Sequence, residues 1–337
     1  MHNISQCHTP ALGGLLQQCT DCGHEQYIYH SCRNRHCPSC QGSKREQWII
    51  NQQSCLLDVP YYHVVFTIPR ELHGLCLYRP RLLYNILFKA SWETIATLSK
   101  DRRYLGAKTG MTAVLHTWSQ NLGLHPHLHC IIPGGGVTKS GKWLTTRSNG
   151  KYLYPVRVLS MVYRAIFMRE VKALARSGAI ILNTDLRRKL YAQRWVVYAK
   201  RPFARPAHVI EYLGRYTHKV AISNYRLNKV NDNGVTFQWK DYRHGAVKKI
   251  MTISTREFIR RFALHILPHR YVRIRHYGIL SSHGRAKVIP QLQDQQNCRP
   301  QIDLIVERPP RFPEICQKCK SDKLVSTILL KVRSRAP

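Results

Sequence analysis

The stretch His125-Pro-His-Leu-His-Cys-Ile-Ile-Pro-Gly-Gly-Gly136 decides how the rest of this sequence is interpreted. The residues before Pro133 are typical of a β-strand, and the proline and the glycines after it end that strand. Side chains two residues apart on a strand point to the same face, so His127 and His129 share one face while Leu128 points into the core. Two imidazoles about 6–7 Å apart on a rigid strand can bind one metal ion. A histidine-rich edge strand without a ligand role is the alternative.

A second strand is predicted beside the first. Residues 110–120 are strand-forming, and a short connection at 121–124 leads into the histidine strand, which predicts an antiparallel pair. His116 on this neighbouring strand could supply a third metal ligand, and a histidine that only lines the sheet edge is the alternative. Further strands are predicted at 59–69, 195–199, 220–223, 234–239 and 247–254, and helices at 80–99, 156–191 and 255–266.

The charge of the chain predicts a polyanionic partner. The 337 residues include 53 Lys and Arg against 18 Asp and Glu, a net charge of +35, and the hydrophobic content of 44% argues against disorder. A folded, strongly cationic protein most often binds nucleic acid, and binding to a ribosome or a membrane surface is the alternative. The sequence shows no secretory signal and no apolar run near 18 residues, which predicts a cytoplasmic protein without membrane contact that acts where its nucleic acid is.

The cysteines predict a structural zinc site. Cys19-Thr-Asp-Cys22 and Cys37-Pro-Ser-Cys40 are two metal knuckles among 12 cysteines, and their four thiolates can close a tetrahedral site. Residues between the knuckles could replace one of these ligands or help hold a second ion; these are Cys32, His36, His24 and His30. Near the end of the chain, Cys316-Gln-Lys-Cys319 is a weaker metal signal, with Cys298 as an uncertain partner, and the roles of these residues stay open.

The segment from Pro206 to His218 predicts a helix that carries two tyrosines. Pro206 suits the first helical turn, and Tyr212 and Tyr216 lie one turn apart on the same helix face. Arg215 and its basic neighbours make the surroundings cationic, as the handling of phosphate requires. Tyrosine pairs at this spacing more often serve packing, so the pair predicts a function only together with the histidine strand.

Together these features fit one reaction. A divalent metal bound by His127, His129 and a third ligand would polarise a scissile phosphate. A tyrosine hydroxyl would then attack phosphorus and form a covalent protein–DNA ester, which a 3′-hydroxyl can later reverse without ATP. Because the pKa of tyrosine is about 10, cationic surroundings or the metal must promote its deprotonation. Two tyrosines would permit two successive cleavages, and the sequence leaves open whether both act and in which order.

Several ordered motifs resemble those of a known family. His127-Leu-His129 followed by Tyr212-x-x-x-Tyr216 is similar to the HUH endonuclease pattern with two tyrosines. More closely, the sequence resembles the rolling-circle insertion-sequence transposases of the IS-ninety-one family over most of residues 15–285. The motifs that carry this resemblance are Cys32-Arg-Asn-Arg-His-Cys-Pro-Ser-Cys40, Leu115-His-Thr-Trp118, His125-Pro-His-Leu-His129, Glu211-Tyr-Leu-Gly-Arg-Tyr-Thr-His218 and Ile274-Arg-His-Tyr-Gly278.

The resemblance implies an α+β fold in which a central antiparallel sheet is flanked by helices. The implied parts are a zinc-binding module at 1–50, a catalytic domain at 51–285 with a helical insertion around 156–191, and a basic C-terminal tail at 286–337 with its Cys-x-x-Cys pair. Tyr212 and Tyr216 carry over as nucleophiles, and His127 and His129 as metal ligands. His116 and His218 are added on geometric grounds, as candidates for a third ligand or a phosphate contact.

The activity that the resemblance implies is cleavage and transfer of single-stranded DNA at the ends of a mobile element, through a 5′-phosphotyrosine intermediate. The expected cofactors are Mg²⁺ or Mn²⁺ for catalysis and Zn²⁺ for structure. The expected partners are single-stranded DNA at the element ends and the target site, and a host helicase could take part. Two alternatives remain: a replication-initiator or relaxase-type nickase with the same chemistry, and a zinc-containing nucleic-acid-binding regulator without catalysis.

Overall fold

The computed structural model consists of two compact units, Met1–Ile50 with Gln301–Pro337, and Asn51–Pro300. The sequence predicted 286–337 as one tail, but this stretch is divided: residues up to 300 belong to the larger unit, and the end of the chain belongs with its beginning. Each unit is described by itself. The residues that the structure describes are 2–37, 40, 42–148, 152–200, 202–203, 208, 214, 221–242, 244–298 and 313–329.

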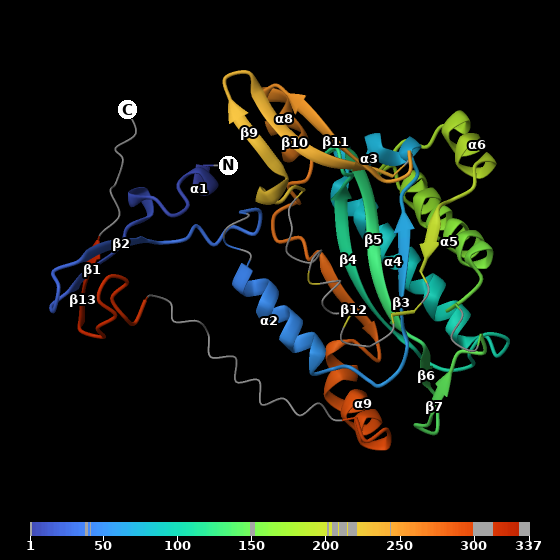
Figure 1. Cartoon of the computed structure of the whole chain (residues 1–337). Helices are drawn as coiled ribbons and strands as arrows, with labels where there is room; N and C mark the ends of the chain where they lie inside the picture. Colours follow the sequence, from blue (N-terminus) through green and yellow to red (C-terminus); the bar gives the residue numbers. More distant parts are fainter. Residues whose placement is uncertain are drawn as a thin grey trace. The chain divides into compact units, whose positions relative to one another are not determined.

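A five-stranded sheet forms the centre of the larger unit (Figure 1). Every neighbouring pair of strands is antiparallel, and the histidine strand β5 lies in the middle. The alternative of an edge strand is therefore wrong. The strands, in their order across the sheet, are β12 (Ile274–Gly278), β4 (Gly110–Trp118), β5 (Leu124–Pro133), β3 (Tyr61–Thr67) and β8 (Val197–Ala199).

Two long helices cover one face of this sheet. Helices α4 (Pro80–Lys100) and α5 (Val156–Arg176) pack against one another and supply buried apolar residues to the same core as the strands. In Figure 1, α4 passes behind the strands and α5 lies next to it on the side of β8. Leu128 is fully buried in this core, as the alternation along β5 predicted. Phe66 on β3 contacts Tyr163 on α5 with ring centroids 4.9 Å apart. Each such buried side chain contributes about 1.5–3 kcal/mol, so the helices fix the sheet and leave its opposite face to carry the histidines.

The two helices predicted around 156–191 are α5 and α6 (Thr184–Ala192). Asn183 caps the N-terminus of α6, where its side-chain oxygen accepts a hydrogen bond from the backbone N–H of Leu186 at 2.8 Å. Further elements of the larger unit are α3 (His73–Tyr78), β6 (Gly135–Val137), β7 (Trp143–Thr145) and α9 (Ser282–Gln295). Helix α2 (Gly42–Gln53) begins in the smaller unit and ends in the larger one.

A smaller sheet packs on the turn between β4 and β5. It consists of β9 (Leu227–Asn231), β10 (Gly234–Asp241) and β11 (Val247–Ile253), with helix α8 (Thr255–Ala263) packed on β10. Leu122, in the β4–β5 turn, is fully buried in the same small core as Phe237 of β10. The guanidinium of Arg226 donates to the carbonyl of Gln120, and that of Arg261 donates to the carbonyl of Asn121. The small sheet is thereby fixed to the end of the histidine strand.

The smaller unit contains a three-stranded sheet built from both ends of the chain. Its strands are β1 (Gly14–Cys19), β2 (Glu25–Tyr29) and β13 (Leu324–Leu329), after a short helix α1 (His2–Ser5). Strand β1 lies in the middle and pairs antiparallel with β2 on one side and β13 on the other. The segment 324–329, which the sequence placed in the tail, is thus an integral strand of this unit.

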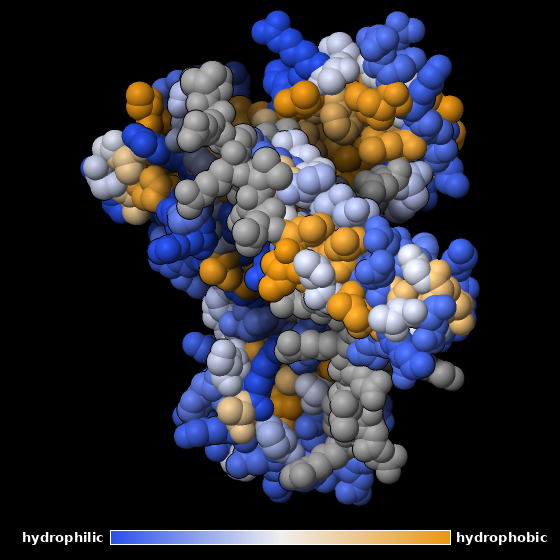
Figure 2. All heavy atoms as spheres, turned by 90° about the vertical axis from the view of Figure 1, so that its left-hand side faces the viewer, coloured by the Kyte–Doolittle hydropathy of each residue, from blue (hydrophilic) through white to orange (hydrophobic). Residues whose placement is uncertain are grey.

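Hydrophilic side chains make up much of the face drawn in Figure 2, with apolar side chains gathered in separate patches between them. Within the part of the chain that the structure describes, no helix has both the length and the apolar character needed to cross a lipid bilayer.

Candidate functional site

Three histidines converge on the face of the large sheet that α4 and α5 leave uncovered. His127 and His129 lie on β5, and His116 of β4 stands directly across from His127 in the antiparallel register. One ring nitrogen from each histidine lies within 4.8 Å of the others, and all three side chains are buried. The Nε2 atoms of His127 and His129 are 3.1 Å apart. The structure therefore brings together the three histidines that the sequence put forward as ligands.

The donor set of this histidine cluster fits a divalent metal ion. Ligands at right angles, each about 2.1 Å from a metal, lie about 3.0 Å from one another, close to the 3.1 Å between the Nε2 atoms of His127 and His129. The backbone carbonyl of His125 lies 2.6 Å from Nδ1 of His127, and a carbonyl can only accept, so Nδ1 carries the proton. The Nε2 lone pair of His127 is therefore directed into the cluster, as metal binding requires.

His63 is a fourth histidine beside the cluster, and the sequence reasoning missed it. It lies on β3, and its Nε2 is 2.8 Å from Nδ1 of His129. The two rings are nearly parallel, with centroids 5.0 Å apart. If His129 binds a metal through Nε2, its Nδ1 carries a proton that it can donate to His63. The two-residue alternation of 61–67 assigns His63 to one face of its strand, but this strand is apolar on both faces, so the pattern alone does not mark His63 as part of a site. The pairing of this strand with β5 is also not evident from the sequence.

Burial keeps these imidazoles neutral. It lowers the pKa of His127 to about 3 and that of His63 to about 4, and it lowers the pKa of His129 well below its usual value. The neighbouring histidines act in the same direction, because each would be repelled by a second positive charge. Neutral imidazole is the form that binds a metal, so His127 and His129 are ready to act as ligands throughout the neutral pH range.

Trp118 connects the histidine cluster to the smaller sheet. Its ring is stacked on that of His116, with centroids 4.4 Å apart, and it also packs against the core that contains Leu122 and Phe237. A bulge in β4 between His116 and Trp118 allows this arrangement. The position of His116 therefore depends on residues from both sheets of the larger unit.

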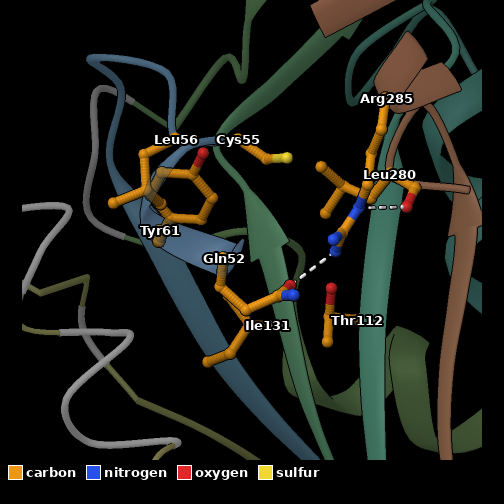
Figure 3. Close-up of a pocket in the computed structure, with 8 residues that line it drawn as sticks. All are labelled: Gln52, Cys55, Leu56, Tyr61, Thr112, Ile131, Leu280 and Arg285. Carbon is orange, nitrogen blue, oxygen red and sulfur yellow. Dashed lines mark hydrogen bonds between the residues drawn. The ribbon is translucent and has the colours of Figure 1, made fainter. Parts of the chain in front are cut away.

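A small hollow lies further along the same face of the sheet (Figure 3). Thr112 and Ile131, which line it, are paired across β4 and β5 two residues beyond the pair Val114 and His129. Figure 3 shows the guanidinium of Arg285 extending between Thr112 and Gln52. It donates to the side chain of Gln52 and to the carbonyl of Leu280, both neutral groups. Arginine stays charged even here, so this hollow adds a positive charge to the histidine-bearing face.

The two predicted nucleophiles, Tyr212 and Tyr216, lie outside the described residues, as does His218. His208 and Gly214, the described residues of that segment, are both helical. The roles of the tyrosines therefore remain those that the sequence assigns.

The predicted zinc site needs a correction, because its two knuckles belong to different clusters. Cys37 and Cys40 join Cys7 and Cys32 in one group of four thiols, while Cys19 and Cys22 join two cysteines near the C-terminus in another. Within each group all the sulfur atoms lie within 4.8 Å of one another. The second group is completed by Cys316 and Cys319.

The sequence reasoning missed Cys7 because this residue has no partner at knuckle spacing. The other residues that it considered as ligands, His24, His30, His36 and Cys298, belong to none of the clusters found among the described residues. The Sγ of Cys298 instead contacts the side-chain oxygen of Gln296. In the knuckle at the C-terminus, the backbone N–H groups of Cys319 and Lys318 lower the pKa of Cys316 to about 6, which favours the thiolate.

Comparisons with known proteins agree with this arrangement. Residues 110–287, which include the histidine strand, match a family model described as "Putative transposase", and residues 1–68 match one described as "Transposase zinc-binding domain". A protein of Sinorhizobium fredii named "Putative transposase y4qJ" is 45% identical over 87% of this chain and 77% of its own length. The transposase for insertion sequence element IS801 of Pseudomonas savastanoi pv. phaseolicola is 29% identical over 86% of this chain and 71% of its own.

Among solved structures, the conjugative relaxase TrwC in complex with oriT DNA, in a metal-free structure, matches 64% of this chain and 94% of its own. The sequence identity is 10% and the TM-score is 0.30.

The chain therefore belongs to the transposase family of the IS-ninety-one type, with an N-terminal zinc-binding module. The α+β fold with a central antiparallel sheet flanked by helices, which the resemblance implied, is confirmed by the structure. The cysteine clusters, together with the matched domain, indicate structural zinc.

Proposed function

We propose that this transposase cuts and rejoins single-stranded DNA at the ends of its mobile element through a covalent 5′-phosphotyrosine intermediate. The observation that carries the proposal is the cluster of His116, His127 and His129, three buried imidazoles on one rigid sheet face. A cluster of this kind in a protein with a net charge of +35 suits a phosphodiester substrate.

The proposed nucleophile is the hydroxyl of Tyr212 or Tyr216. Its oxygen forms a bond to phosphorus while the bond from phosphorus to the 3′-oxygen of the preceding nucleotide breaks. The proton of the tyrosine is lost, and the departing 3′-oxygen takes up a proton to become a free hydroxyl. The phosphate stays on the 5′ side, joined to tyrosine, and attack by a 3′-hydroxyl on that ester reverses the step and joins strands without ATP.

The residues that would hold a catalytic Mg²⁺ or Mn²⁺ are His116, His127 and His129. The chemistry that such an ion supplies when bound is neutralisation of negative charge on the phosphate oxygens. The chain itself fixes the imidazoles: the carbonyl of His125 holds the ring of His127, and His63 holds that of His129. This second layer of contacts orients the ligands before DNA arrives.

The exposed face of the smaller sheet is the surface that we propose for the DNA backbone. Lys229, Lys240 and Lys248 are exposed, and the strand pairing places them on the face of that sheet opposite to the buried Phe237. Replacing all three by Gln should weaken the binding of single-stranded DNA and reduce the slope of log affinity against log salt by about 2, at about 0.7 per lost phosphate contact. The matched control is the triple replacement of Arg187, Arg188 and Lys189 on α6 by Gln, which should leave the slope unchanged.

The test of the chemistry uses a labelled single-stranded oligonucleotide that carries the element end. We expect a protein–DNA adduct that survives denaturant, needs Mg²⁺ or Mn²⁺, and disappears when both Tyr212 and Tyr216 are replaced by Phe. Tyr225→Phe, at a tyrosine that is 76% exposed, is the matched control and should retain the adduct. Tight binding without an adduct on any strand from the element would instead support the non-catalytic regulator. An adduct that forms only on a plasmid origin would support the replication-initiator alternative.

A further inference from the structure

We propose that Cys19, Cys22, Cys316 and Cys319 form a second structural zinc site, which fastens the end of the chain to its beginning. The zinc-binding domain that the family comparison matches ends at residue 68, so it contains only two of these four cysteines. The remaining cluster of Cys7, Cys32, Cys37 and Cys40 lies wholly within the matched domain. The smaller unit would then hold two zinc ions rather than one.

The distances between the sulfur atoms fit zinc and do not fit disulfides. Four thiolates about 2.3 Å from a zinc ion at the centre of a regular tetrahedron lie about 3.8 Å from one another. The Sγ atoms of Cys19 and Cys319 are 3.5 Å apart, and those of Cys22 and Cys316 are 3.7 Å apart. A disulfide would require about 2.05 Å. The sulfur atoms therefore stand slightly inside the spacing at which one zinc ion would be held by all four.

Strand pairing and neighbouring hydrogen bonds place the two knuckles close together. Strand β1 ends at Cys19, which pairs with Leu324, the first residue of β13. Beyond that pair, the N–H of Thr20 donates to the carbonyl of Lys323 at 3.1 Å. The carboxylate of Asp21, between Cys19 and Cys22, accepts a hydrogen bond from the hydroxyl of Ser321 at 2.6 Å. The two Cys-x-x-Cys turns are thus held face to face at the same end of the sheet.

The second knuckle has the internal hydrogen bonds of a preformed metal loop. The N–H of Lys320 donates to the carbonyl of Cys316 at 2.9 Å, and the N–H of Cys316 donates to the carbonyl of Ser321 at 2.7 Å. These bonds close a tight turn around the pair of sulfur atoms. Cys316 is buried and Cys319 is exposed, so the knuckle offers one sheltered and one accessible thiol.

The proposed zinc site would link two segments that lie near opposite ends of the chain. Cys22 and Cys316 are separated by 294 positions, and the whole larger unit lies within that interval. Closing so long a loop carries a large entropy cost, which the metal–thiolate bonds would offset together with the pairing of β1 and β13. The zinc module would accordingly be completed only after the last part of the chain is present.

The test measures zinc content in the full-length protein after gel filtration, by elemental analysis per mole of chain. We expect the double variant Cys316→Ser with Cys319→Ser to hold one zinc equivalent less than the unaltered protein. The matched control, Cys55→Ser with Cys298→Ser, removes two cysteines that lie outside both clusters and should lose none. A C316S/C319S protein with the full zinc content would overturn the proposal.

A second readout covers the case in which the serine variant folds poorly. The unaltered protein is loaded with Co²⁺ in place of zinc, and its thiolate-to-cobalt absorption is compared with that of the single variant Cys319→His, which keeps a metal ligand at the exposed corner. Two Cys₄ sites predict that the absorption per chain falls by about an eighth when one of eight thiolates is replaced. An unchanged absorption would contradict the site, as would mass spectrometry showing that Cys19 and Cys319, or Cys22 and Cys316, are joined as disulfides.

Discussion

The histidine cluster and the cysteine clusters solve the same problem, the placing of metal ligands, in two different ways. The histidines lie on neighbouring strands of one sheet, whose other face is packed against α4 and α5. The cysteines lie in turns and at a strand end of the smaller unit, and one cluster joins segments near the two ends of the chain. The first site is therefore built by packing, and the second needs its metal to be complete.

The largest expected effect is the response of the two regions to removal of metal. A strong chelator at neutral pH should leave hydrogen-exchange protection of β4 and β5 within about threefold of its original value, because packing maintains that sheet. Protection of β1 and β2 should fall by about a hundredfold or more, because thiolate ligands without metal no longer hold the turns together. Hydrogen exchange followed by peptide mass spectrometry measures both at once. Equal losses of protection in the two regions would contradict the view that packing maintains the histidine site while metal maintains the cysteine sites.

The next effect concerns activity without loss of fold. Replacing His127 and His129 by Ala should lower the rate of adduct formation by at least about a thousandfold, since the phosphate loses its charge neutralisation. The thermal transition of the larger unit should move by only a few degrees, because α4 and α5 and the opposite sheet face are untouched. Rate assays and differential scanning calorimetry measure these quantities. The control is His283→Ala, at an exposed histidine on α9 of the same unit, which should alter neither.

A smaller effect is expected at His63, which contacts the proposed metal ligand His129 but is not itself proposed as a ligand. His63→Ala removes the acceptor for Nδ1 of His129 and should weaken binding of Mn²⁺ by about 10- to 100-fold. His63→Gln, whose side-chain oxygen can accept the same hydrogen bond, should restore part of the affinity. Titration calorimetry with Mn²⁺ measures both variants. If Ala and Gln behave alike, His63 serves only to fill space.

The smallest expected effect is a pH dependence of stability at a histidine that is buried but does not belong to the histidine cluster. His265 is buried beside the β4–β5 turn, where its Nε2 lies 3.0 Å from the carbonyl of Leu122, and burial lowers its pKa to about 4. The unfolded chain takes up a proton at this residue below about pH 6.5, whereas the folded chain does so only near pH 4. Because of this difference in pKa, the free energy of unfolding is undiminished above pH 6.5 and decreases progressively as the pH falls toward 4.

From pH 7 to pH 5, His265 should therefore account for a loss of about 2 kcal/mol in the free energy of unfolding. His265→Gln can keep a hydrogen bond to Leu122 but cannot titrate, so this variant should lose that much less stability over the same range. Urea unfolding of the larger unit at the two pH values measures the difference. Equal losses of stability in the two proteins would show that the pKa of His265 is the same in the folded and the unfolded chain.

The same contrast explains what could be predicted from the sequence. The β4–β5 pair and the three converging histidines follow from two-residue alternation and a short connection, both of which are local patterns. His63 was missed because the register of β3 against β5 depends on packing between segments far apart in the chain. The two zinc knuckles were wrongly combined because spacing identifies a knuckle but does not identify its partner, which here lies 294 positions away.

The central claim is that one of two tyrosines becomes covalently joined to the 5′ side of the cleaved DNA. The most direct measurement is peptide mass spectrometry of the protein after reaction with an element-end oligonucleotide, followed by nuclease and protease digestion. The account predicts a nucleotide phosphate attached to Tyr212 or Tyr216, with the histidine cluster intact and metal present. A nucleotide attached to any other residue, or cleavage that leaves a 5′-phosphate with no protein attached, would contradict it.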